Sequence, residues 1–162
     1  MKRVIRLWVS MALILASVSC NVSSRETAER YVENLYRTLI VPSYQTDKPL
    51  ESLYERFCTP ELQELMARDA QQSDGEIGLI DMDLWIAAQD WCDDLDLISV
   101  SRYREVSPDT VWVKARLRNC DGEHDVMLVV TANDTMWQVD DFPQYWDDEW
   151  HSLKAALRSS GW

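Results

Sequence analysis

The sequence predicts an α+β domain in which N-terminal helices pack on a four-stranded antiparallel meander and a C-terminal helix follows the sheet. Two observations predict this class. Apolar residues recur at three- and four-residue spacing in the first half of the chain, and from Leu95 the spacing changes to two. Helices that precede the strands, instead of alternating with them, are typical of α+β domains. The chain of 162 residues is also long enough for one such domain with its own core.

Residues 1–19 have the pattern of an export signal. The basic residues Lys2, Arg3 and Arg6 precede the apolar run LWVSMALILA and the small residues SVS. This apolar run is shorter than the ~18 to 20 residues that a membrane-spanning helix needs. We therefore expect a signal peptide and not a transmembrane helix.

Cys20 follows this signal and predicts a lipid anchor. Together with Val18 and Ser19 it resembles the lipobox of bacterial lipoproteins, whose cysteine is acylated and becomes the mature N-terminus. Ser17 stands where Leu is more frequent, so an ordinary secretory signal with a chance cysteine is the alternative. We expect residues 20–25 to be a tether and residues 26–162 a single domain, anchored in the bacterial envelope and facing the periplasm or the cell exterior.

The charge of the chain restricts its partners. The full sequence carries 16 basic and 28 acidic residues, a net charge of −12. Removing residues 1–19 leaves 13 basic residues against the same 28 acidic ones, a net charge of −15. Such a chain repels nucleic acid and anionic lipid surfaces, so a nucleic-acid partner is not expected. The charge suits solubility of a tethered domain, or docking onto a basic protein.

Helices are predicted in three segments of the first half. Apolar residues from Glu26 onward indicate an amphipathic helix that ends before Pro42, and residues 42–49 are expected to be a loop. A second helical segment covers LESLYERF, residues 50–57. Thr59 is a good N-cap and Pro60 suits the first turn, so a third helix should run through residues 61–72.

Four strands and a last helix complete the prediction. The strands cover residues 95–106, 109–119, 123–132 and 134–142, and the turns SPD, CDG and AND join them. Along the second strand, successive side chains point to opposite faces. One face carries the apolar residues Val111, Val113, Ala115 and Leu117, and the other carries Trp112, Lys114, Arg116 and Arg118. We expect the first of these faces to be buried. Residues 143–162 should form a C-terminal helix with Trp146, Trp150, Leu153 and Leu157 on one side.

Three cysteines remain besides Cys20, so at most one intramolecular disulfide can form, with three possible pairings. A hairpin that turns near Ser107 and Pro108 places Cys92 and Cys120 at the same end of the sheet. Cys92–Cys120 is therefore the preferred pairing, although a register change of a few residues would separate the two. Cys58 would then be a buried small apolar residue.

Two motifs resemble a known family. The first comprises Ile80, Asp81, Asp83, Ala88, Gln89 and Asp90, and the second comprises Trp137, Val139, Asp140 and Asp141. Over residues 28–142 they resemble a group of bacterial exported proteins known as domain of unknown function 3828. Leu84 and Trp85 stand where that group is expected to have Pro-Phe. The resemblance implies a cone-like fold similar to the nuclear transport factor 2 and cystatin-like superfamily, in which a curved sheet wraps around helices and often leaves a pocket. It implies no activity.

Asp81, Asp83 and Asp90 have two interpretations. They are weak candidates for a catalytic cluster at the mouth of the cone, because close carboxylates raise each other's pKa and can serve acid–base chemistry. Alternatively, they cap turns and tie the loop to backbone groups, as Asp side chains commonly do. The second interpretation is favoured.

The tryptophans also have two interpretations. Eight is a high count, and most of them are expected to pack in the core. The alternative is a rim of a pocket or partner surface, because aromatic side chains give large contact areas at low entropic cost. The residues expected at this rim are Trp85, Trp91, Trp137, Asp140 and Asp141.

Other chemistry has little support, and no cofactor or metal is expected. The acidic stretch DDLD, residues 93–96, lacks the spacing of a calcium loop. Cys120 and His124 are two ligands of the four that a zinc site needs. With four glycines the chain has no glycine-rich phosphate loop, and neither His124 nor His151 lies beside a recognisable nucleophile.

The sequence therefore favours a non-enzymatic binding module that is lipid-anchored at Cys20 and engages a small ligand or another envelope protein. One alternative is a small pocket enzyme of the isomerase or hydrolase type that uses the Asp cluster. The other is an immunity or inhibitor protein for a basic toxin, which the net charge alone suggests.

Overall fold

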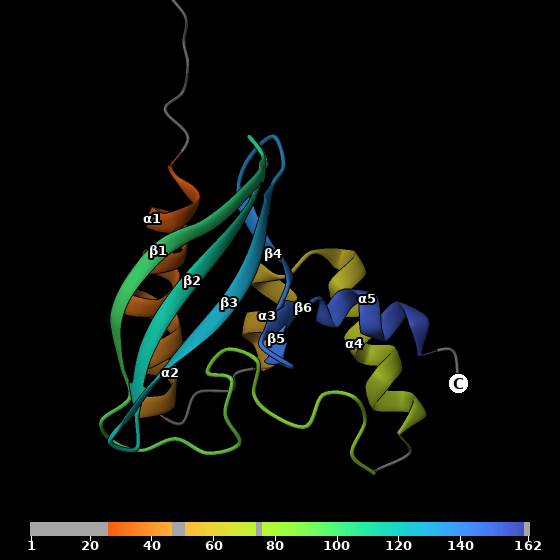
Figure 1. Cartoon of the computed structure of the whole chain (residues 1–162), viewed down its shortest axis with the longest axis horizontal. Coiled ribbons are helices and arrows are strands. Elements are labelled where there is room, and N and C mark those ends of the chain that lie inside the picture. The colour runs from red at the N-terminus through yellow and green to blue at the C-terminus, as the bar shows by residue number, and fades with distance from the viewer. Residues whose placement is uncertain (1–25, 47–50, 74–75, 161–162) are drawn as a thin grey trace, which may run out of the picture.

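The structure, a computed structural model, describes residues 26–46, 51–73 and 76–160 (Figure 1). The predicted signal peptide at 1–19, Cys20 and the predicted tether at 20–25 lie outside the described residues. Within the described ranges no helix is long and apolar enough to cross a membrane.

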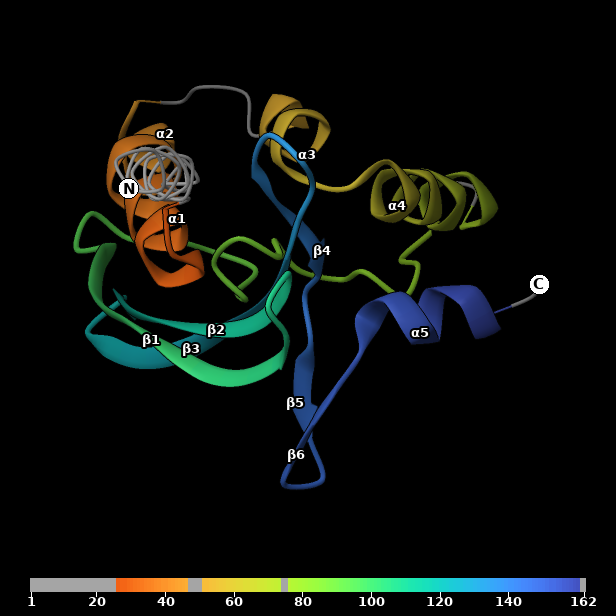
Figure 2. The ribbon, with the colours of Figure 1, turned by 90° about the horizontal axis from the view of Figure 1, so that it is seen from above.

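A four-stranded antiparallel sheet forms the centre of the domain. Its strands are β1 (Asp96–Ser107), β2 (Thr110–Asn119), β3 (Gly122–Ala132) and β4 (Trp137–Asp141), and their order in the sheet is β1-β2-β3-β4. This is the meander that the alternating pattern predicts. Figure 2 shows that the sheet curves and that the N-terminal helices lie on its concave side.

The N-terminal helical segment is longer than predicted. It comprises α1 (Ala28–Leu35), the π-helix η1 (Tyr36–Ile40) and α2 (Val41–Gln45), with Thr27 as N-cap. The expectation that the helix ends before Pro42 is wrong. Pro42 occupies the first turn of α2, where a missing backbone N–H costs little, and the wider π-helical turn precedes it.

The next two helices follow their sequence signals. They are α3 (Glu51–Phe57) and α4 (Pro60–Gln72). The Thr59 hydroxyl accepts a hydrogen bond from the Leu62 backbone N–H, which confirms the predicted N-cap. The Thr59 backbone N–H also donates to the Val139 carbonyl at 2.8 Å, so the start of α4 is attached to β4.

The core lies between the concave face of the sheet and the helices. The predicted inner face of β2 is buried: Val111, Val113, Ala115 and Leu117 are each at most 2% exposed. From the helices, Val32, Tyr36, Ile40 and Leu62 pack in the same cluster with no exposed surface. Alternation along β2 therefore predicts correctly which face is covered by helices.

The C-terminal segment differs from the prediction of one helix over 143–162. It begins with a hairpin, β5 (Gln144–Trp146) and β6 (Glu149–His151), and only then forms α5 (Leu153–Ser159). Asp147 and Asp148 form the turn with φ of 50° and 62°, a conformation that Asp tolerates and that two-residue hairpins require. The hairpin extends past the sheet on the side away from α1, and α5 lies beside α4 (Figure 2).

Candidate functional site

The acidic stretch at residues 79–91 is a loop whose middle enters the hydrophobic core. Residues 83–88, called here the core loop, close on themselves because the Asp83 N–H donates to the Ala88 carbonyl at 3.0 Å. Ala87 has a φ of 47°, which lets the chain reverse. The three side chains between Asp83 and Ala87 are at most 2% exposed: Leu84, Trp85 and Ile86. The core loop thus brings apolar side chains into the interior.

Asp83 holds the start of this loop. Its Oδ2 accepts a hydrogen bond from the Tyr44 hydroxyl at 2.6 Å, and its Oδ1 accepts from the Tyr54 hydroxyl at 2.9 Å. Oδ1 also accepts from the Trp85 backbone N–H at 3.0 Å. Burial, together with the charge of Asp83, raises the pKa of both tyrosines well above the usual range. Both tyrosines therefore stay neutral donors to the carboxylate.

Two further hydrogen bonds hold the backbone of the core loop. The Tyr36 hydroxyl donates to the Trp85 carbonyl at 2.7 Å, and the His124 Nε2 lies 2.6 Å from the Ile86 carbonyl. Tyr36 comes from η1 and His124 from β3, so the loop is fixed between the helices and the sheet.

The structure does not bring the three candidate acids together. Asp81 and Asp90 are exposed, whereas Asp83 is half-buried and hydrogen-bonded to tyrosines. Neither exposed carboxylate shares a hydrogen-bond partner with Asp83 in the part of the chain that the structure describes. Among these three acids only the Asp83 side chain holds the loop, as the structural interpretation expects; Asp81 and Asp90 accept hydrogen bonds through their backbone carbonyls.

Asp140 and Asp141, at the end of β4, attach α5 to the sheet. The Asp141 Oδ1 accepts from the Lys154 backbone N–H at 2.8 Å, and burial raises the pKa of Asp141. The Asp140 Oδ1 accepts from the Thr59 hydroxyl at 2.9 Å and from the Lys154 Nζ at 2.6 Å. Both carboxylates serve the packing of α4, α5 and β4 and are not part of a rim.

The predicted tryptophan rim is not assembled either. Trp85 is completely buried and Trp137 is 6% exposed, so both belong to the core. The Trp137 indole N–H donates to the Glu26 carbonyl at 2.7 Å. Of the three tryptophans predicted for the rim, Trp91 alone is exposed, and its ring centre lies 5.2 Å from that of Tyr44. The alternation along β4 that places Trp137 on the inner face explains this correction.

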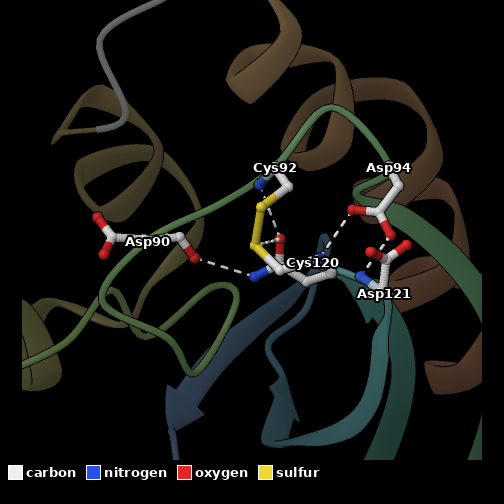
Figure 3. The surroundings of a disulfide bond; sticks show 6 residues. Asp90, Cys92, Asp94, Cys120 and Asp121 are labelled. Atoms are coloured by element: carbon white, nitrogen blue, oxygen red, sulfur yellow. Dashed lines mark hydrogen bonds between the residues drawn. A yellow bond between two sulfur atoms is a disulfide. The ribbon is translucent and has the colours of Figure 1, made fainter.

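The disulfide that the hairpin register favours is present. Cys92 and Cys120 are bonded, with their Cα atoms 5.0 Å apart (Figure 3). Cys58 is free and buried, and burial raises the pKa of its thiol to about 12, so it is an unreactive core residue. Cys120 is consumed by the disulfide and cannot ligate zinc with His124. The described residues contain no group of three or more His, Cys, Asp or Glu side chains that could hold a metal ion.

Asp94 supports the turn beside this disulfide. Its carboxylate accepts hydrogen bonds from the backbone N–H groups of Cys120 at 2.7 Å and Asp121 at 2.8 Å (Figure 3). Cys120 and Asp121 have φ values of 51° and 62°. Donation by the Asp121 N–H, and then by the Cys120 N–H, lowers the pKa of Asp94 below its ordinary value of 3.8.

A pH-dependent stability difference follows for Asp94→Ala. A carboxylate whose folded-state pKa is depressed adds stability above its unfolded-state pKa and loses it as the pH falls through the folded-state pKa. We expect Asp94→Ala to unfold more easily than the wild type at pH 7, and the difference to shrink as the pH falls below the ordinary carboxyl pKa of 3.8 and through the lowered folded-state pKa. Urea unfolding at a series of pH values measures this. A difference that stays constant down to the lowest pH would assign the effect to something other than the ionised carboxylate.

A groove that the sequence did not indicate lies between the outer face of the sheet and the β5–β6 hairpin. Its volume is about 460 Å³. One wall consists of Tyr103, Arg104 and Trp112 from β1 and β2. The other consists of Tyr145, Asp148, Glu149 and Trp150 from the hairpin. We call these seven residues the aromatic groove.

The aromatic side chains of the groove form two separate pairs. Tyr103 and Trp112 have ring centres 6.3 Å apart, and Tyr145 and Trp150 have ring centres 5.1 Å apart. Tyr103 is 53% exposed and Tyr145 is 58% exposed, so large ring surfaces face solvent. The Arg104 guanidinium lies 4.3 Å above the Trp112 ring, in a cation–π contact.

Charges of opposite sign line the two walls without pairing. Arg104 forms no ion pair, and neither Asp148 nor Glu149 pairs with a cation, within the described ranges. Other cations on the same sheet do find partners: Lys114 lies 3.2 Å from Asp125, and Arg116 lies 3.1 Å from Glu123. The groove therefore combines exposed rings with unpaired charges, a combination typical of surfaces that bind ligands or partners.

The sequence did not indicate this groove because residues 143–162 were expected to form a helix. Apolar residues at 146, 150, 153 and 157 fit a helix, whereas the hairpin follows from the Asp147–Asp148 turn between aromatic residues. A two-residue acidic turn flanked by Tyr145-Trp146 and Trp150 was the available signal.

Comparison with known proteins finds no match for the chain. No protein-family model, no curated protein and no solved structure matches the chain. The resemblance to domain of unknown function 3828 therefore stays a prediction that rests on the two motifs.

Proposed function

We propose that this chain is a lipid-anchored, non-enzymatic binding module of the bacterial envelope, and that the aromatic groove is its binding surface. The observation that carries the proposal is the groove itself, in which two exposed aromatic pairs lie beside Arg104, Asp148 and Glu149 without ion-pair partners in the described part of the chain. Unpaired charges beside exposed rings gain contacts when a ligand binds.

The acids in residues 79–91 support a binding function over an enzymatic one. Asp83 accepts three hydrogen bonds that hold the loop, so most of the roughly four acceptor positions of its carboxylate are already engaged by the protein. A general base has to reach a substrate proton. The Tyr44 and Tyr54 hydroxyls already occupy the places beside the Asp83 carboxylate where a substrate would have to bind. Asp81 and Asp90 are exposed at the surface and do not lie in an enclosed site.

Export and anchoring at Cys20 complete the proposal. The exposed Cys92–Cys120 disulfide supports an oxidising compartment such as the periplasm or the cell exterior, because such bonds are rare in the cytosol. The domain begins at α1 soon after the proposed tether, so an acylated Cys20 would hold the domain close to the membrane surface.

The proposal predicts a bound species that depends on the groove. The full-length chain would be extracted from the envelope of its host in mild detergent and measured by native mass spectrometry. We expect a non-covalent adduct in the wild type, and its loss in Tyr103→Ser/Tyr145→Ser, because these exposed rings supply contact area without supporting the core. The mass of the chain also reports whether Cys20 carries acyl chains.

Trp91→Ser is the matched control for this experiment. It removes another exposed aromatic side chain, 48% accessible, that does not line the groove. The control should keep the adduct. An adduct that survives in the double groove variant, or is lost equally in Trp91→Ser, would contradict the assignment of the binding surface.

A further inference from the structure

We infer that the aromatic groove binds an extended peptide segment of a basic protein, and that an arginine or lysine side chain of this segment occupies the hairpin wall. The inference rests on the proposed function, because it names the partner of the same groove. Three features carry it: the composition of the hairpin wall, the place of Arg104 and the charge balance of the groove and of the chain.

The hairpin wall has the composition that recognises a cation. Tyr145 and Trp150 form an aromatic pair, and Asp148 and Glu149 stand on the same short hairpin. A guanidinium or ammonium group gains from the face of an aromatic ring and from a carboxylate at the same time. No cation of the described chain fills this place, so the attraction is available to a partner.

Arg104 on the opposite wall performs a different task. Its guanidinium carbon lies over the Trp112 ring, 4.3 Å from the ring centre, so a cation already packs on an aromatic face in this groove. The edge of a stacked guanidinium keeps its N–H donors free for acceptors, and a peptide backbone offers a carbonyl at every residue. A basic peptide can therefore place its carbonyls toward Arg104 and its cationic side chain toward Asp148 and Glu149.

The charge balance favours a basic partner over a neutral one. A neutral ligand that covers the groove removes water from Asp148, Glu149 and Arg104. Because it provides no opposite charge to replace that water, the desolvation of these charges costs binding free energy. The chain as a whole has a net charge of −12, so its long-range field also attracts a basic protein and accelerates the encounter.

The turn allows the charge to be removed without changing the hairpin. Asp148 has a φ of 62°, a conformation that Asn adopts as readily as Asp. Asp148→Asn/Glu149→Gln therefore deletes two charges and keeps the shape. Asp93→Asn/Glu55→Gln is the matched control, because it makes the same chemical changes at two exposed acids that do not line the groove.

The experiment uses the full-length chain in detergent and a fluorescent peptide of repeating Gly-Leu-Arg units. A second peptide carries citrulline, the neutral isostere, in place of arginine. We expect the wild type and the control variant to bind the arginine peptide more tightly than the citrulline peptide. Asp148→Asn/Glu149→Gln should weaken arginine-peptide binding by about tenfold and leave citrulline-peptide binding unchanged. Added salt should weaken only the charge-dependent part.

NMR signals of the Trp112 and Trp150 indoles report where each ligand binds. Equal affinity for the arginine and citrulline peptides in the wild type would overturn the inference, since the groove would then not recognise charge. Shifts of both indoles by a neutral oligosaccharide such as chitotetraose, with none caused by either peptide, would also overturn it and leave the proposed function standing. The absence of any groove-dependent adduct in the native mass spectrum would overturn both this inference and the proposed function.

Discussion

Trp85→Ala is expected to lower the free energy of unfolding by about 3 to 5 kcal/mol, the range for deleting a large buried aromatic side chain. Trp85 has no exposed surface, its ring stacks on Tyr54 with centres 5.2 Å apart, and it meets Phe142 edge-on at 4.9 Å. Removing the indole would leave a cavity where the core loop, α3 and the segment after β4 meet. Urea unfolding followed by circular dichroism measures the change.

Two variants test whether this loss comes from packing. Trp85→Phe should cost less than half as much, because Phe fills most of the space and the Trp85 indole nitrogen has no hydrogen-bond partner within the described residues. Phe is also the residue that the resemblance leads us to expect at this position. Trp91→Ala, at an exposed site, should cost about 1 kcal/mol or less. A loss below about 1 kcal/mol for Trp85→Ala would mean that the core loop is not held by its tryptophan.

Local signals predicted the elements whose structure is decided locally. Alternation in β2 identifies its buried face because side chains of a strand point to opposite faces in turn. Thr59 and Pro60 mark the start of α4 because capping involves only the next few residues. The Cys92–Cys120 pairing follows from the hairpin, even though bulges shift the register between β1 and β2.

The candidate site could be predicted only in part, because its contacts are long-range. Asp83 is recognisable as a polar residue in an apolar stretch, yet its partners Tyr44 and Tyr54 lie 39 and 29 residues away in the sequence. No spacing rule links residues at such distances. Gly78 is a similar case: a Cβ there would clash with the Asp69 carboxylate, and that crowding is visible only in the fold.

The aromatic groove illustrates the other limit, competition between two local patterns. Residues 144–151 satisfy a helical spacing of apolar residues and also a hairpin with an acidic turn. Ser152, the N-cap of α5, decides between them because it starts a new helix after the hairpin. The hairpin then adds its wall to the outer face of β1 and β2, which brings together residues about forty positions apart in the sequence.

Removal of the disulfide by Cys92→Ser/Cys120→Ser is expected to lower the free energy of unfolding by about 3.5 kcal/mol. The bond joins residues 28 positions apart, and this value follows from the entropy that such a loop loses in the unfolded chain. The wild type should lose the same stability when a reducing agent is added, whereas the variant should not respond. Urea unfolding with and without the reducing agent measures both effects.

The same variant separates stability from binding. Trp112 lies near the start of β2 and Cys120 follows its end, about 25 Å away at the rise of an extended strand. Because the groove is at the end opposite the disulfide, the folded variant should bind a groove ligand with the affinity of the wild type. A parallel loss of affinity in conditions where the variant is folded would show that the disulfide end and the groove are coupled through the sheet, and the groove could then no longer be treated as an independent surface.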